Sequence, residues 1–351
     1  MINKNKEILE IVKVISNGKN ALIYGSLYSG KTTFLKQLSA VLVKEKINYF
    51  FIDCKKCFDA RSFLTEYSKE GLRVLSEKVA GVVKDAYQML PNIKPSISSS
   101  GTKGAELTMS YSLTDDDISK FASDVLQAPY RISQSREEQV VVVLDNYENL
   151  MSIENLNLSG FIAKNIGKGV VYVLSTADQE LFLAVNKKEQ KKLAIDLVKT
   201  IERPTETQLK KNIQLQFKEQ SIEEGAAQSL VSLLVGDLKA ISECINFYGK
   251  KALTIKEIKK NVSLILEQKE QVFQLYFDSL SVHQKKLIIA IAKHTGQHVF
   301  KSQFIYNNGL ISVPSVQTSI KGLIKKQFLH KDDAGLKITD VFFAEWLRRY
   351  F

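Results

Sequence analysis

The stretch Gly25-Ser26-Leu27-Tyr28-Ser29-Gly30-Lys31-Thr32 matches the pattern G-x-x-x-x-G-K-[ST] of a phosphate-binding P-loop. The apolar run Ala21–Tyr24 comes directly before it and is typical of a buried strand, and residues 32–43 follow with apolar side chains at helical spacing. A loop between a strand and a helix points backbone N–H groups and the positive end of the helix dipole at a phosphate. The stretch therefore predicts an α/β P-loop NTPase core, with a parallel sheet in three layers.

The residue types of this loop suit the binding of a nucleoside triphosphate. Gly25 and Gly30 keep the backbone free of a Cβ where it turns toward the phosphates. Lys31 is expected to reach the β- and γ-phosphates, and Thr32 is expected to bind Mg²⁺. ATP and Mg²⁺ are therefore the predicted cofactors. The predicted nucleotide-binding residues are Gly25, Ser26, Ser29, Gly30, Lys31, Thr32 and Thr33.

A second apolar run supplies the acid that a P-loop requires. Asp145 follows Val140–Leu144, so its carboxylate would leave a buried parallel strand at the carboxyl end, where α/β sheets bind ligands. Asp145 is therefore predicted to hold Mg²⁺ together with Thr32, directly or through water. Many P-loop ATPases place a glutamate next, but this chain has Asn146, and the nearest acid is Glu148. Two interpretations stay open: Glu148 acts as the catalytic base from a turn, or it is a surface acid and hydrolysis is slow.

Two further strands are expected, at Asn48–Asp53 and Val170–Ser175. Ser175, at the end of the second, is a candidate for contact with the γ-phosphate or the attacking water, the role called sensor 1 in AAA+ ATPases. The alternative is a strand-end hydroxyl that caps the next helix. The candidate catalytic residues are Lys31, Asp145, Asn146, Glu148 and Ser175.

The composition is that of a soluble globular protein with an excess of positive charge. Of the 351 residues 44% are hydrophobic and 25% charged, with no apolar stretch long enough to span a membrane and no apolar segment near the N-terminus. Three cysteines cannot form a disulfide framework, and Cys54-x-x-Cys57 has no second pair with which to bind zinc. These features predict a cytoplasmic protein without a membrane partner. The net charge of +11 favours an acidic partner such as nucleic acid, although a solvated lysine surface would have the same composition.

Three segments lie outside the elements of the nucleotide core. Pro91–Ser112 has alternating apolar residues around a Ser/Gly-rich bend and predicts a β-hairpin or an exposed loop, and a helix is expected at Thr114–Ala128. From Pro204 to about Leu280 the strand signals end, and helical periodicity predicts a small lid. The predicted domains are an ATPase core at 1–203 with an inserted hairpin at about 91–113, a helical lid at 204–279, and a third domain at 280–351.

The third domain has the pattern of a winged helix-turn-helix. Helices are expected at Ser281–Lys293, Ser302–Asn308 and Ser315–Gln327, and residues 328–339 predict a two-stranded wing. The third helix is expected to bury Val316, Ile320, Leu323 and Ile324, and to expose Gln317, Thr318, Ser319, Lys321, Lys325 and Lys326. The candidate DNA-binding residues are Gln317, Thr318, Lys321, Lys325 and Lys326. The alternative is a winged helix that packs on its own core or on a partner, because this helix has no arginine for a bidentate contact with guanine.

The order of P-loop, acid-terminated strand, lid and winged helix resembles that of the archaeal-type ATPases, members of the STAND group beside the AAA+ ATPases. I-T-D-V-F-F-A-E-W-L-R-R at 338–349 is similar to the family's D-P-x-F-x-x-W-L-R-R ending, and L-S-V-H-Q-K-K-L-I-I-A-I-A at 280–292 is similar to the start of its winged helix. The chain departs from the family at Leu27-Tyr28, where arginines are usual, and at Asn146. The family's lid often carries G-G-x-P followed by a basic residue, and this chain has Val235-Gly236-Asp237-Leu238-Lys239 in that place. Lys239 is therefore the only nearby substitute for the family's sensor 2 arginine.

Two functions follow from these features. The first is an ATP-binding and ATP-hydrolysing switch that acts on DNA through the winged helix. The second is a STAND-type signalling switch, whose nucleotide state controls a protein partner, with slow hydrolysis and no direct contact with DNA. The positive charge favours the first function and Asn146 favours the second. Either switch is compatible with a protein partner or a homo-oligomer.

Overall fold

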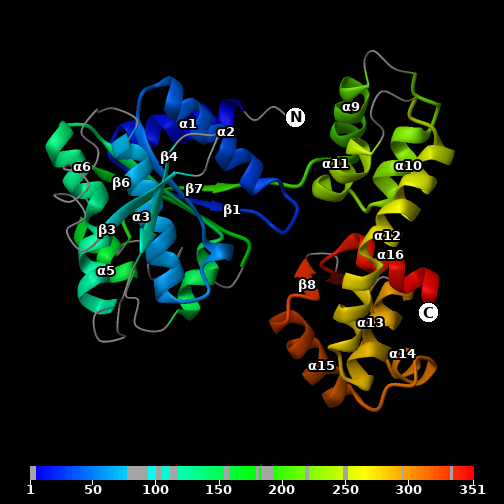
Figure 1. Cartoon of the computed structure of the whole chain (residues 1–351). Helices are drawn as coiled ribbons and strands as arrows, with labels where there is room; N and C mark the ends of the chain where they lie inside the picture. The colour runs from blue at the N-terminus through cyan, green and yellow to red at the C-terminus, as the bar shows by residue number, and fades with distance from the viewer. Residues whose placement is uncertain are drawn as a thin grey trace. The chain divides into compact units, whose positions relative to one another are not determined.

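The computed structural model contains two compact units, Asn3–Arg203 and Pro204–Phe351, which are described separately (Figure 1). The structure describes residues 5–76, 94–99, 105–110, 118–153, 158–165, 167–178, 182, 193–217, 221–247, 252–294, 296–332 and 335–351. Within these ranges, no helix combines the length and the apolar character that a bilayer crossing requires.

A parallel five-stranded sheet forms the centre of the first unit. In spatial order its strands are β2 (Asn48–Asp53), β5 (Val140–Asp145), β6 (Val170–Thr176), β1 (Asn20–Tyr24) and β7 (Ile195–Thr200). Since all neighbours are parallel, the P-loop after β1 and the carboxylate at the end of β5 emerge at the same edge of the sheet. The edge strand β7 was missed by the sequence analysis, because most of its residues are only partly buried or exposed and it has no continuous apolar run.

Helices cover both faces of this sheet and complete the three layers. One face packs against α1 (Asn5–Ser16) and α2 (Lys31–Lys44). The other packs against α3 (Ala60–Ser76), α5 (Ile118–Leu126), α6 (Ala128–Arg136) and α7 (Leu158–Asn165). Val141 and Val143 of β5 face the first layer, whereas Val140, Val142 and Leu144 face the second. The run of apolar residues in β5 is continuous because both of its faces are covered.

The first unit also contains short elements outside the sheet and its covering helices. Two 3₁₀ turns, η1 (Cys54–Lys56) and η3 (Tyr147–Ser152), follow β2 and β5. Strands β3 (Lys94–Ser99) and β4 (Ala105–Ser110) pair antiparallel within the segment predicted to form a β-hairpin or an exposed loop. Where one helix was expected at Thr114–Ala128, the described residues form α5 and the start of α6, and the predicted cap Thr114 lies outside the described residues.

Four helices open the second unit: α9 (Glu206–Gln216), α10 (Ala226–Leu233), α11 (Leu238–Asn246) and α12 (Ile255–Asp278). A capping box between Thr205 and Gln208 fixes the start of α9. The 24-residue helix α12 contributes to one continuous hydrophobic core that also contains the buried residues of the winged helix. The lid and the winged helix therefore share one core and form one compact unit.

The winged helix contains α13 (Val282–His294), α14 (Ser302–Asn307), α15 (Val313–Lys325), the wing strands β8 (Leu329–Asp332) and β9 (Gly335–Ile338), and α16 (Val341–Tyr350). Helix α15 begins two residues earlier than expected. Its N-cap is Ser312, which forms a capping box with Ser315, and Pro314 is accepted in the first turn because no intrahelical N–H bond is needed there.

Two burial predictions for α15 were wrong. Ser319 is buried, with its hydroxyl 2.8 Å from His283 Nδ1 of α13, so it faces the core rather than solvent. Ile324 is 41% exposed, because it lies in the last turn of the helix, beyond the buried stripe that ends at Leu323.

The W-L-R-R ending has a structural role in this unit. Arg348 Nε donates to the carbonyl of Ala292 in α13 at 2.8 Å, and Arg349 Nη1 donates to Ser263 Oγ in α12 at 2.9 Å. The Trp346 ring stacks on Phe343 and lies beside Phe273 of α12. These contacts hold α16 against both the long lid helix and the first helix of the winged helix.

Candidate nucleotide site and nucleic-acid surface

The P-loop backbone depends on its two glycines. Gly30 is the N-cap of α2, and its φ of 88° is a backbone conformation that residues with a side chain rarely adopt. A Cβ on Gly25 would lie 2.5 Å from Ser29 Oγ and 2.7 Å from the carbonyl oxygen of Ile201. Ser29 Oγ is buried and has no hydrogen-bond partner among the described residues. The loop is therefore tightly packed on its inner side and carries an unsatisfied hydroxyl there.

Lys31 is held in the loop by carbonyl groups. Its Nζ donates to the carbonyl of Gly25 at 2.6 Å and to that of Ser26 at 3.3 Å, and the residue is 6% exposed. Burial lowers the pKa of Lys31 to about 8, against the opposing effect of the carboxylates of Glu148 and Asp145. An ammonium group that burial disfavours, within reach of a glycine loop and a helix N-terminus, is well placed to gain stabilisation from a phosphate.

Asp145 connects the loop to the neighbouring strand. The carboxylate is fully buried and accepts hydrogen bonds from Thr32 Oγ1 at 2.6 Å and from Ser175 Oγ at 2.5 Å. The structure thus brings together the two predicted Mg²⁺ ligands and the predicted sensor. A hydroxyl and a carboxylate are hard oxygen donors, and Mg²⁺ is usually bound by one or two such protein groups together with substrate phosphates. These residues fit a magnesium nucleotide.

Asn146 and Glu148 lie beside this group. Asn146 is left-handed, with φ of 59°; its N–H donates to Ser175 Oγ at 3.1 Å and its Nδ2 donates to Asp53 Oδ1 at 3.3 Å. Glu148 Oε1 accepts the N–H of Ala177 at 3.2 Å. Glu148 Oε2 is buried and has no hydrogen-bond partner among the described residues. Glu148 is therefore fixed within electrostatic reach of Lys31, and one of its oxygens is a buried acceptor without a hydrogen-bond partner among the described residues.

Two residues of this site were missed by the sequence analysis. Asp53 ends β2 as Asp145 ends β5, and the two are paired in register, so the acid at the end of the predicted strand was a usable signal. Arg203 Nε donates to Ser26 Oγ and to the carbonyl of Leu27, both at 3.1 Å. Arg203 follows the strand β7, and without that strand its place next to the P-loop had no signal in the sequence. The remaining predicted residue of the loop, Thr33, is exposed.

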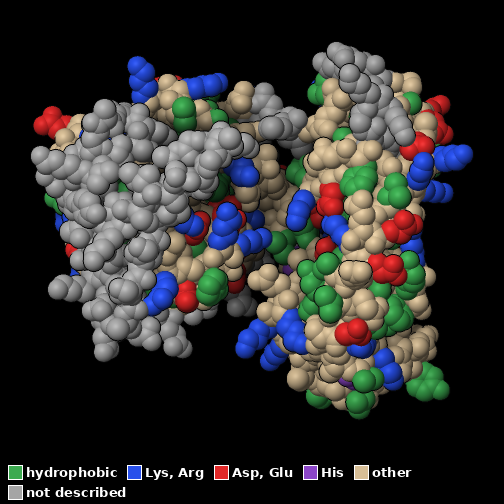
Figure 2. Space-filling view, viewed as in Figure 1, with side chains coloured by type: hydrophobic (Ala, Val, Ile, Leu, Met, Phe, Trp, Pro, Cys, Tyr) green, Lys and Arg blue, Asp and Glu red, His purple; other side chains and the backbone are tan. Residues whose placement is uncertain are grey.

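The predicted DNA-binding residues are all exposed on α15 or at its C-terminal end, but they are not equivalent. Gln317, Lys321 and Lys325 extend from the helix surface, and Thr318 Oγ1 donates back to the carbonyl of Pro314. Lys326 Nζ instead donates to the carbonyl of Ser279 at the end of α12, at 3.0 Å. In Figure 2, Lys and Arg side chains gather over the edge of the second unit formed by α15 and β8.

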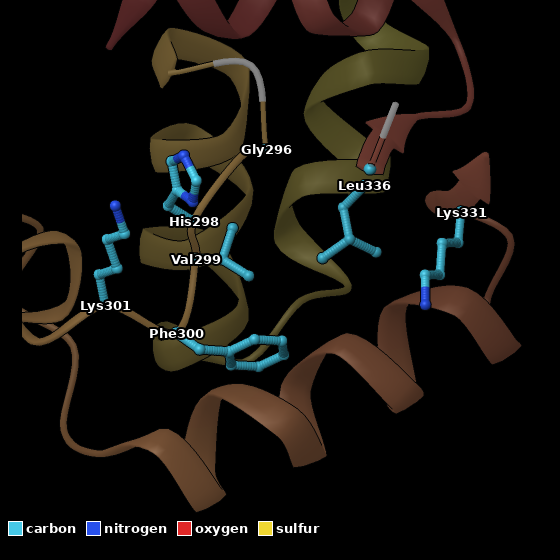
Figure 3. Close-up of a pocket in the computed structure, with 8 residues that line it drawn as sticks. Gly296, His298, Val299, Phe300, Lys301, Lys331 and Leu336 are labelled. Atoms are coloured by element: carbon cyan, nitrogen blue, oxygen red, sulfur yellow. The ribbon is translucent and has the colours of Figure 1, made fainter. Parts of the chain in front are cut away.

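A pocket of about 400 Å³ opens between the segment that precedes α14 and the wing (Figure 3). Its floor is formed by the buried side chains of Val299 and Leu336, and the half-exposed ring of Phe300 lies between Lys301 on one side and Lys331 on the other. The pocket therefore combines an apolar floor with cationic edges, next to the positive surface of α15.

The comparisons with known proteins agree with this fold. The family model of a probable winged helix domain matches residues 271–349. A Walker-type ATPase of Pyrococcus abyssi is similar, with 14% identity, coverage of 99% of this chain and 96% of that chain, and a TM-score of 0.62. The ORC1 protein of Aeropyrum pernix, solved in complex with DNA, has 12% identity, coverage of 99% and 92%, and a TM-score of 0.57. The ORC2 protein of the same organism, solved with ADPNP and ADP, has 14% identity, coverage of 99% and 93%, and a TM-score of 0.55.

No curated protein matches the sequence. The solved structures confirm the predicted fold class over nearly the whole chain: a P-loop NTPase core with a parallel sheet, followed by a helical region and a C-terminal winged helix.

Proposed function

We propose that this protein is an ATP-dependent molecular switch that acts on DNA through its winged helix. The observation that carries the nucleotide part is the convergence of Lys31, Thr32 and Asp145 at the end of the sheet. Lys31 and the loop N–H groups would hold the triphosphate, while Thr32 and Asp145 would hold Mg²⁺. When bound, the metal would neutralise charge on the phosphate oxygens. The cofactors are accordingly ATP and Mg²⁺.

For hydrolysis, we assign Glu148 as the group that accepts the proton of the attacking water. Its Oε1 is held by the backbone of Ala177, which leaves the buried Oε2 as the basic atom. Ser175 and Asn146 have a positioning role, because the Ser175 hydroxyl donates to Asp145 and accepts from the Asn146 N–H. Asn146 lies directly after Asp145, where many P-loop ATPases have a glutamate, and this difference supports slow turnover.

The DNA part of the proposal rests on the exposed surface of α15. Gln317, Thr318, Lys321 and Lys325 offer polar and cationic groups to a major groove and to phosphates. The similar ORC1 protein was solved with DNA, which supports the same kind of partner for this chain.

The second candidate is the signalling switch with a protein partner. It is favoured by exposed apolar side chains next to α15, above all Tyr306, which is 86% exposed, and Ile311, which is 78% exposed. Apolar residues in such positions are more typical of a protein interface than of a phosphate contact.

A titration of a fluorescent duplex separates the two candidates. Binding would be measured at several salt concentrations without nucleotide, with ADP and with a non-hydrolysable ATP analogue. The switch on DNA requires salt-dependent binding whose affinity differs between the ADP and ATP states, and Asp145→Asn should lose Mg²⁺-dependent turnover. If the wild-type protein binds no duplex at low salt in any nucleotide state, the signalling function is correct instead.

A further inference from the structure

The segment that leaves β7 runs along the P-loop. The N–H of Ile201 donates to the carbonyl of Tyr24 at 2.6 Å, and the carbonyl of Ile201 packs against Gly25. Two residues later, Arg203 donates to Ser26 and to Leu27. Successive residues of the segment therefore contact successive residues of the loop.

Arg203 also contributes charge to the nucleotide site. Its guanidinium group is among the cations that lower the pKa of Lys31, which places it within electrostatic reach of the lysine that would hold the phosphates. An arginine side chain matches phosphate oxygens well, because its planar fork carries several donors and stays charged. A triphosphate in the loop would therefore attract Arg203 and change its bonds to Ser26 and Leu27.

Pro204 and Thr205 connect Arg203 directly to the start of α9. Arg203 is the last residue of the first unit, and the chain enters the second unit at Pro204. Proline has a fixed φ and restricts the residue before it to extended conformations. Thr205 is then fixed to α9 by its capping box. The chain from the P-loop contact of Arg203 to the start of α9 is therefore two residues long, and Pro204 and the capping box restrict its backbone.

We propose that Arg203 is a positioning residue that couples occupancy of the P-loop to the orientation of the lid and winged-helix unit. The inference rests on the proposed binding of ATP and adds the residue that transmits the nucleotide state. Phosphate in the loop rearranges the hydrogen bonds of Arg203, and the short Arg203-Pro204-Thr205 link passes this change to α9. In this proposal Arg203 supplies, from the link, an arginine that responds to the nucleotide. The lid itself offers only Lys239 for such a contact.

The test measures the distance between the two units in the full chain. Spin labels would be attached through Lys36→Cys on α2 and Tyr306→Cys on α14, both exposed positions. The native cysteines are buried; burial raises the pKa of Cys57 and Cys244 to about 12 and also raises the pKa of Cys54 well above its usual value, so they should label slowly. Distances would be recorded without nucleotide, with ADP and with an ATP analogue.

With Arg203 in place, the distance between the two labels should change with the nucleotide state. Arg203→Ala should abolish this change. The same variant should bind ATP about tenfold more weakly, because one charge-assisted hydrogen bond is lost. Arg203→Lys should recover part of the affinity but not the change in distance, because lysine keeps the charge without the fork. Arg136→Ala is the matched control, since Arg136 also donates to a backbone carbonyl, that of Val74, in the same unit. It should leave both readouts unchanged.

The outcomes distinguish this inference from the function on which it rests. A full change in distance in Arg203→Ala, or none in a wild-type protein that binds nucleotide, would overturn the role of Arg203 alone. If wild type binds no more ATP than Lys31→Ala does, the P-loop function fails, and the role of Arg203 fails with it.

Discussion

Both units of this protein contain lysines that we propose to bind phosphate groups, but the surroundings of these lysines differ. Lys31 is buried, and its ammonium group is fixed by two carbonyl oxygens of the loop. Lys321 and Lys325 are exposed on α15. A fixed, desolvated cation acts on one position of one ligand, whereas an exposed cation is screened by salt and acts on any phosphate nearby. The first kind of site should respond to mutation with a loss of binding, the second with a graded change.

The largest effect is expected for Lys31→Ala. The variant should fold, because the side chain is tied only to loop carbonyls, but ATP binding should be abolished or strongly weakened. Isothermal titration with MgATP, together with circular dichroism as the folding control, would check this. Wild-type affinity in the folded variant would contradict the assignment of the loop.

The next effect concerns hydrolysis. Glu148→Gln should bind ATP normally and turn over about 10²-fold or more slowly, the usual contribution of a general base. The substitution keeps the shape of the side chain and the acceptor for Ala177 N–H. Single-turnover hydrolysis with saturating ATP measures the step directly. An unchanged rate would leave Glu148 with a structural role and favour the signalling switch.

A smaller effect should appear as a dependence of ATP binding on pH. Lys31 carries its charge below its pKa of about 8 and loses it above. The ammonium form binds phosphate, so the affinity for MgATP should be nearly constant at and below pH 7 and about tenfold weaker at pH 9. Lys31→Arg serves as the control, because an arginine remains charged throughout this range. The same loss in both proteins would show that another group titrates.

The smallest effect is predicted for the winged helix, and it separates lysines that look alike in the sequence. Replacing Lys321 and Lys325 by alanine should make the slope of log K against log salt shallower by about 0.9 for each lost phosphate contact. Helix α15 should remain, since its buried face is unchanged and alanine favours helices. Lys326→Ala is the control, because Lys326 is bound to the carbonyl of Ser279. Equal slopes for wild type and the double variant would remove α15 from the DNA interface.

The sequence was most informative where backbone geometry and chemistry are tied together. The P-loop, the strand that ends in Asp145 and the winged helix follow from glycine placement and hydrophobic period, and these determine the fold. Lys31, Thr32, Asp145 and Ser175 lie together in the structure because the carboxyl ends of parallel strands share an edge.

The missed features depend on contacts between residues distant in the chain. The edge strand β7 has a mixed pattern, so Arg203 was not expected at the loop, 176 residues from Leu27. The bond between Lys326 and Ser279 likewise depends on how α15 packs against the end of α12, which periodicity does not encode. Ser319 was assigned to the exposed face of the predicted third helix, whereas here His283 provides a partner for its hydroxyl inside the domain.

Helix α12 gives the second unit the properties of a lever. With 24 residues it is about 36 Å long, and its apolar face is buried in the core shared by lid and winged helix. A rotation of about 10° at its lid end would move the opposite end by about 6 Å, or roughly two base-pair steps of B-DNA. In the proposed switch on DNA, a small rotation of α9 and the lid would thus become a displacement of the winged helix on the scale of the contacts to a duplex.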